Sequence, residues 1–212
     1  MKAPDTLPAR MFLLAFDPRR NRFTARGELG YLLRAAALAE LVLNGHLADA
    51  DGKARAGKYP GEQDPVLFAV WERVSQDSPR SWRRWVSVDR RGIFAAVRDQ
   101  LVEARVVRSE RVRLLGLIPY TRLTLREPHR ARRLQEEVAR AVRGGEPAAR
   151  LEPGLAALAA LASAGQLRVV LGGRDRRRFK ARVAELGAPI EPIPKALQRA
   201  IASQRAAAAS SG

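Results

Sequence analysis

The chain of 212 residues contains no cysteine, which excludes disulfide bonds and thiol catalysis and fits a reducing compartment. It has two histidines, His46 and His129, and neither stands among other ligands at the spacing of a metal site. The sequence also lacks a phosphate-binding loop, a nucleophile elbow and a dinucleotide fingerprint. We therefore expect no metal, no cofactor and no enzymatic activity.

Long apolar runs are missing as well. No stretch approaches the roughly 18 apolar residues that a membrane span needs. The first ten residues, MKAPDTLPAR, have no apolar core of the kind found in signal peptides. We expect a cytoplasmic protein that is soluble or that binds a membrane from outside.

Acidic residues are few relative to basic ones. The chain has 39 Lys+Arg against 22 Asp+Glu, a formal net charge of +17. A surface this positive attracts polyanions, which include nucleic acids, anionic membranes and acidic proteins. Charge alone does not choose among these partners.

What the sequence has instead is a strongly apolar central stretch, residues 28–47. Between residues 29 and 43 the charged side chains are Arg34 and Glu40. A helix that is apolar nearly all round is a buried helix, and Gly45 can close it in a left-handed conformation. Because buried charges need partners, Glu40 should pair with backbone or another Arg. Arg34 is either structural, with its stem carrying the charge outward, or faces an anionic ligand.

Helical spacing, caps and breakers outline the rest of the chain. The segment 49–64 reads as a loop or hairpin, and Trp82 and Trp85 share a helix face as core anchors, with membrane anchoring as the alternative. The densest positive charge, Arg174 to Arg182, reads as a solvated helix face. Helices are predicted over Pro65–Val74 after the N-cap Asp64, Ser78–Trp85, Gly92–Val107, 127–142, Leu155–Ala164 and Ala196–Arg205.

A β-hairpin is predicted within residues 106–125, because Val112 to Thr121 is β-prone around Gly116 and Pro119. If Gly116 marks the turn, four large apolar side chains lie near the tip. These are Leu114, Leu115, Leu117 and Ile118.

The domain organisation follows from these segments. We expect an extended N-terminal arm over residues 1–10, one mainly α-helical domain over residues 11–205, and a disordered tail over residues 206–212.

Several of these elements, in this order and spacing, resemble the Golgi phosphoprotein 3 family over roughly Met11 to Leu171. The Arg- and Ala-rich composition is similar to that of a bacterial, high-GC member. The motifs are FLLAFD near the start, Arg34 followed by ELVLNGHL, GEQDPVLFAVW at Gly61–Trp71, the Pro79–Trp85 stretch, and QLVEARVVRSERVRLLGL at Gln100–Leu117.

The resemblance implies a mainly α-helical fold round a buried central helix, with a projecting hydrophobic β-hairpin. It also implies a basic pocket for a phosphoinositide head group, built from a Trp, the central-helix Arg and two later Arg. By position these fall near Ala25, on Arg34, on Arg91 and on Phe94. Two of the four agree, with Phe23 two residues from Ala25 and Arg98 one turn beyond Phe94.

Three functions remain open from the sequence. The first is a peripheral protein on the inner face of the membrane, in which Arg34, Arg91 and Arg98 bind anionic lipid and the four tip residues insert. The second is a nucleic-acid-binding regulator, because a helix followed by a hairpin also describes a winged helix. The third is a scaffold whose hairpin docks on a second copy of the chain.

Overall fold

The computed structural model describes residues 4–58, 61, 64–77, 79–114 and 118–210. Over these residues the protein is mainly α-helical, as predicted. The α-helices are α1 Leu7–Leu14, α2 Leu29–Leu43, α3 Pro65–Gln76, α4 Trp82–Ser87, α5 Arg90–Glu103, α6 Pro128–Arg143, α7 Pro153–Ala164, α8 Gly173–Arg178, α9 Lys180–Gly187 and α10 Ile193–Ser210, with short 3₁₀ helices at Ala148–Arg150 and Ala188–Ile190.

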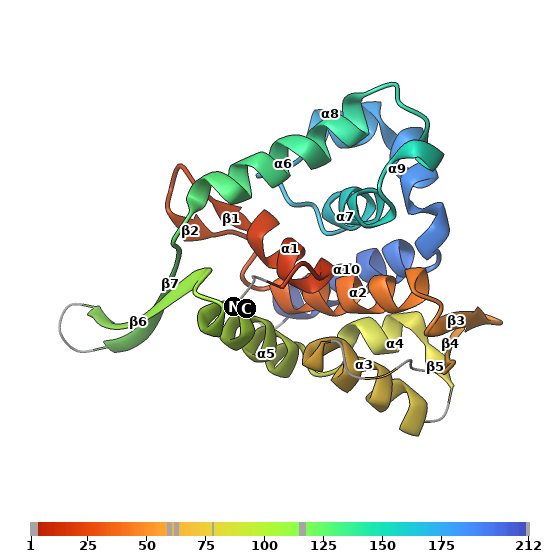
Figure 1. The fold of residues 1–212 in the computed structure, drawn as a ribbon, viewed down its shortest axis with the longest axis horizontal. Helices are drawn as coiled ribbons and strands as arrows, with labels where there is room; N and C mark the ends of the chain where they lie inside the picture. The colour runs from red at the N-terminus through yellow and green to blue at the C-terminus, as the bar shows by residue number, and fades with distance from the viewer. Residues whose placement is uncertain (1–3, 59–60, 62–63, 78, 115–117, 211–212) are drawn as a thin grey trace.

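The strands among the described residues form three small antiparallel sheets. β1 Phe16–Asp17 pairs with β2 Arg22–Phe23. β3 Leu47–Ala50, β4 Lys53–Ala56 and β5 Arg80–Ser81 form a three-stranded sheet. β6 Val107–Leu114 and β7 Ile118–Leu125 form a hairpin that stands out from the helical body (Figure 1).

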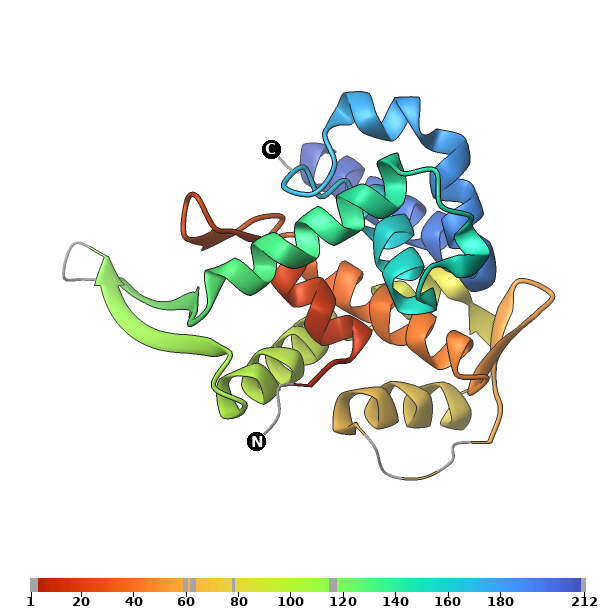
Figure 2. The ribbon, with the colours of Figure 1, turned by 45° about the horizontal axis from the view of Figure 1, so that its top comes forward.

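Helix α2 is the centre of the core, as its composition predicts. Its buried residues, which include Leu32, Leu33 and Leu38, lie on all sides of the helix. It contacts α1, α3, α4, α5, α7 and α10, so helices from both ends of the chain pack around it (Figures 1 and 2). The helix ends before Gly45, whose φ of +73° places it in the left-handed region.

A close approach between helices fixes the start of α2. A Cβ atom on Gly30 would lie 2.5 Å from the carbonyl oxygen of Arg90, so glycine is required where α5 meets α2. The guanidinium of Arg90 stacks on the ring of Tyr31 at 4.4 Å. The two helices are thereby held together at their first turns.

Local signals explain several other elements. Asp64 caps α3, because its Oδ1 accepts hydrogen bonds from the backbone nitrogens of Val66 and Leu67. The predicted loop or hairpin after α2 is the β3–β4 hairpin, which turns at Asp51 and Gly52. Trp82 and Trp85 are 2% and 0% exposed, so both are core anchors and neither lies at a surface that could meet a membrane.

Both chain ends differ from the prediction. Helix α1 begins at Leu7, so residues 7–10 belong to the packed body and not to an extended arm. Thr6 caps this helix and Pro8 occupies its first turn, an N-terminal signature that the sequence carries. At the other end, α10 continues to Ser210 through the segment predicted to be disordered from residue 206. Its alanine-rich sequence suits a helix.

Candidate functional site

The β6–β7 hairpin is anchored at its base and exposed along its length. Val107 and Leu125 face each other in the first pair of the ladder, and both are buried. Beyond them no described side chain is buried, although Val112 and Leu123 are apolar and only partly exposed. The exposed arginines at the base and along the shaft are Arg108, Arg111, Arg122 and Arg126, and here they are called the shaft arginines.

One of the shaft arginines is neutralised locally. Arg108 pairs with Glu110 at 2.7 Å on the same strand. For Arg111 and Arg122 no ion pair is formed with any other residue that the structure describes. The hairpin shaft therefore carries net positive charge into solvent.

Two of the four predicted tip residues can be placed by the pairing of the strands. The register makes Leu114 and Ile118 the last pair of the ladder, while Leu115 and Leu117 lie outside the described residues. The structure thus places the start of the tip at the far end of the hairpin from the body (Figure 1).

A second basic segment lies beside the hairpin base. The β1–β2 turn carries the exposed residues Arg19, Arg20 and Arg22, and strand β2 contacts β7. The turn is held by Asp17, whose Oδ1 accepts hydrogen bonds from the backbone nitrogens of Arg19 and Arg20. The β1–β2 turn and the β6–β7 hairpin lie on the same side of the molecule (Figure 2), and both carry exposed arginines.

Arg34 lies inside the protein. It is 4% exposed, and its Nε donates to the backbone oxygen of Trp85 at 3.3 Å. The guanidinium therefore turns inward, whereas the sequence suggested that its stem would carry the charge outward. Burial lowers the pKa of Arg34 to about 10, against the favourable charge of Asp89. Its Nη2 atom is buried without a hydrogen-bond partner among the described residues.

Arg34, Arg91 and Arg98 are not gathered into one cavity. Arg34 lines a cavity of about 580 Å³ between α3 and α5, and neither of the other two is among its lining residues. Arg91 is exposed in the first turn of α5. Arg98 is paired with Asp99 through two hydrogen bonds, of 2.7 and 3.0 Å.

Aromatic residues near the implied pocket are part of the core. Phe23 is 6% exposed and packs edge-on against Phe12 and Phe16, with ring centroids 4.6 and 5.1 Å apart. Phe94 lies 5.8 Å from Phe12. Ala25 is half-buried in a left-handed conformation, with φ of +51°. These residues pack the body at the positions where the resemblance implies Trp and Arg.

Glu40, the other charge in α2, binds backbone as expected. Its Oε2 accepts a hydrogen bond of 2.7 Å from the backbone nitrogen of Leu7, the first residue of α1. Burial raises the pKa of Glu40 to about 7, and the Leu7 hydrogen bond opposes this rise. The carboxylate thus joins α1 to α2.

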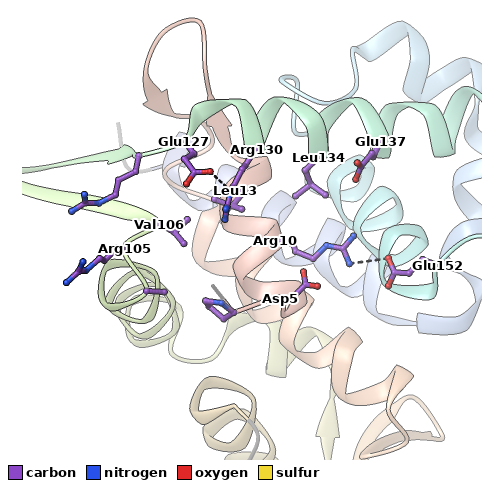
Figure 3. A pocket seen from close by; sticks show the side chains of 13 residues that line it. Asp5, Arg10, Leu13, Arg105, Val106, Glu127, Arg130, Leu134, Glu137 and Glu152 are labelled. Carbon is purple, nitrogen blue, oxygen red and sulfur yellow. Dashed lines mark hydrogen bonds and ion pairs between the residues drawn. The ribbon is translucent and has the colours of Figure 1, made fainter. Parts of the chain in front are cut away.

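Sequence reasoning missed a cavity of about 890 Å³ at the base of the hairpin, between α1, α6 and the α5–β6 junction. Two ion pairs lie in its lining, Arg10 with Glu152 at 3.1 Å and Arg130 with Glu127 at 2.6 Å (Figure 3). Its lining holds as many carboxylates as arginines. No local pattern predicts it, because Arg10 and Glu152 are 142 positions apart.

Over the residues that the structure describes, no helix has the length and apolar character needed to cross a bilayer.

The fold and its surface define a class of protein: a mainly α-helical body round a buried helix, with a basic hairpin arm. The model of the Golgi phosphoprotein 3 (GPP34) family matches residues 7–204, and the chain belongs to this family. The match covers nearly the whole chain and confirms the resemblance. No curated protein sequence matches it.

Proposed function

We propose that this protein is a peripheral membrane protein that binds anionic phospholipid head groups and inserts its hairpin tip into the lipid interface. The observation that carries the proposal is the hairpin itself. It projects from the helical body, and its shaft arginines are exposed. The sequence around its turn contains four large apolar residues, Leu114, Leu115, Leu117 and Ile118. An arm with a basic shaft and an apolar tip matches the layered chemistry of a membrane surface.

Two contributions to the free energy of membrane binding add up in this arrangement. Each basic residue near an anionic surface contributes about 1 kcal/mol. Burial of the tip side chains adds about 25 cal/mol per square ångström of apolar surface. Neither contribution alone gives stable binding, but the hairpin combines both.

The finer proposal is selectivity for a phosphoinositide at the inner face of the membrane. It rests on family membership and on the positions of Arg34, Arg91 and Arg98. Arg91 is exposed and can meet a head group at the surface. Arg34 is buried beside a cavity whose lining holds four carboxylates and two arginines, so the first contact with a head group falls to Arg91.

The test is sedimentation with vesicles of neutral lipid, of generic anionic lipid and of phosphoinositide-containing lipid, each at low and high salt. The variant Arg111→Glu/Arg122→Glu reverses two shaft arginines. Its matched control, Arg177→Glu/Arg199→Glu, makes the same charge change on α8 and α10, away from the hairpin. We expect the shaft variant to bind anionic vesicles about 30-fold more weakly, because at least two contributions of about 1 kcal/mol are lost.

Equal loss in both variants would show that total charge, not the hairpin, binds the membrane. Absence of binding to every vesicle would contradict the proposal. Preference for phosphoinositide over generic anionic lipid would support the finer proposal.

A nucleic-acid-binding role is the second candidate, and the basic hairpin shaft is the observation that favours it. A gel-shift titration of the same variants with duplex DNA separates the two functions. Steep salt dependence and loss in the shaft variant would favour nucleic acid over lipid. Light scattering of Leu114→Ser/Ile118→Ser tests the third reading, in which the hairpin joins two copies of the chain.

A further inference from the structure

A basic cavity of about 720 Å³ lies on α6, apart from the hairpin shaft and from Arg34. Three segments distant in sequence form it: the end of β1 with the following Pro18 and Arg19, one face of α6, and the turn after α7 at residues 168–170. Its lining includes four arginines, Arg19, Arg132, Arg143 and Arg168.

The walls of this cavity are fixed by buried and paired groups. Gln135 is 9% exposed, and its Nε2 donates to the backbone oxygens of Leu14 and Phe16, at 3.2 and 2.6 Å. This amide ties the end of α1 and the start of β1 to α6. Directly after the lining residues 168–170, the backbone oxygen of Leu171 accepts a hydrogen bond of 2.7 Å from Arg176.

The positive charge of the lining is only partly matched. Arg143 is paired with Asp175 at 2.6 Å. Asp17 accepts hydrogen bonds from the backbone nitrogens of its own turn and lies 3.9 Å from Arg20, which is outside the lining. The lining thus holds four arginines against two carboxylates, Asp17 and Glu136, and Arg19, Arg132 and Arg168 form no ion pair among the described residues.

Four other cavities among the described residues do not share this imbalance. The hairpin-base cavity holds four arginines and four carboxylates, and the Arg34 cavity holds two arginines and four carboxylates. A cavity at the end of α6 is balanced, and one beside Glu40 is acidic. The high arginine content of the chain therefore does not by itself produce a basic cavity.

We propose that this cavity is a binding site for a phosphate-bearing group, a phosphomonoester or diphosphate. Guanidinium groups present planar donors that match phosphate oxygens in pairs. The volume lies within the range of about 300–1,000 Å³ found for small-molecule sites, so it has room for more than a single phosphate. Ala139, Val169 and Val170 supply an apolar wall for the organic part of the ligand.

The ligand chemistry has two possible sources, a soluble phosphorylated compound and a phosphomonoester lipid head group. The site does not depend on the hairpin, so it stands whether or not the hairpin enters a membrane. The experiment has one arm for each source. Inorganic pyrophosphate, titrated by calorimetry, probes the soluble source, and sedimentation with vesicles of phosphatidic acid in phosphatidylcholine probes the lipid source.

The test variant is Arg132→Ala/Arg168→Ala. The matched control, Arg133→Ala/Arg174→Ala, removes two exposed arginines from the same part of the molecule, neither of which lines the cavity. We expect the test variant to bind pyrophosphate at least tenfold more weakly and the control to stay within twofold of the wild type. Melting temperatures of both variants check that the fold is intact.

The outcomes distinguish a soluble ligand, a lipid head group and the absence of a site. A cavity-dependent loss with pyrophosphate assigns a soluble ligand. A cavity-dependent loss with phosphatidic acid vesicles, without pyrophosphate binding, assigns a lipid head group. Equal losses in the test and control variants, or no cavity-dependent binding in either arm, would overturn the proposal.

Discussion

Helix α2 and the β6–β7 hairpin differ in where their charged side chains lie: those of α2 are inside the protein, and those of the hairpin are at the surface. The two charged residues of α2 are turned inward, Arg34 onto the Trp85 carbonyl and Glu40 onto the Leu7 nitrogen. The arginines of the hairpin shaft are exposed, and Val107 and Leu125 alone among its described side chains are buried. A change of charge in α2 should therefore appear as a change in stability. The same change in the hairpin should appear as a change in binding.

The largest effect is expected from Arg34→Glu. It replaces a buried guanidinium by a buried carboxylate near Asp89, whose charge already acts on this site. An unpaired buried charge costs about 3–5 kcal/mol in the free energy of unfolding. Arg34→Met keeps the volume and removes the charge, so its cost should be within about 1 kcal/mol. Urea unfolding measures both, and similar losses in the two variants would show that packing dominates at this position.

A smaller and pH-dependent effect is expected from Glu40→Gln. The pKa of Glu40 is raised from 4.5 to about 7, so the folded state holds this proton more tightly than the unfolded state. Its contribution to stability is therefore fully present below about pH 4.5 and is lost as the pH rises to about 7. Glutamine cannot ionise, and its oxygen can still accept the Leu7 hydrogen bond.

Glu40→Gln should therefore raise the free energy of unfolding at pH 8 by about 1–2 kcal/mol, a value reduced for the partial exposure of the group. At pH 4.5 the variant and the wild type should agree. Urea unfolding at the two pH values provides the measurement, and a gain that is equal at both would argue against titration of Glu40.

The smallest effect on stability is expected from Arg111→Glu/Arg122→Glu, the variant designed for the vesicle experiment. Both side chains are exposed, and surface substitutions of this kind usually change stability by less than about 0.5 kcal/mol. The melting temperature should thus stay within a few degrees of the wild type. A loss of stability as large as that of Arg34→Glu would show that the hairpin arginines, like Arg34, contribute to folding.

The parts of the fold that could be predicted are those with dense local signals. The Leu and Ala pattern of α2, the Asp64–Pro65 start of α3 and the left-handed Gly45 each depend on neighbours in sequence. The start of α1 at Leu7 carried a similar signal in Thr6 and Pro8, but Pro4 and Pro8 together favoured the prediction of an extended arm. Helix boundaries elsewhere moved by a few residues, as in α5, which ends at Glu103 and not at Val107.

The candidate sites depend on contacts between residues far apart in the sequence, so they were harder to predict. Nothing near Gln135 in the sequence indicates that its amide binds the carbonyls of Leu14 and Phe16, about 120 positions away. The inward turn of Arg34 depends on where α4 places the carbonyl of Trp85. Arg19, Arg132 and Arg168 become neighbours only after the fold is formed, so their shared cavity could not be read from spacing.

Helix α6 connects the two surfaces proposed to bind anions. Two residues separate it from the end of strand β7, and its second and last turns carry Arg132 and Arg143 of the basic cavity. A continuous helix has a fixed rise of about 1.5 Å per residue, so α6 is a rigid element roughly 24 Å long. A ligand held in the cavity is thereby kept at a set distance from whatever the hairpin touches, and bending of this one helix is what would change that distance.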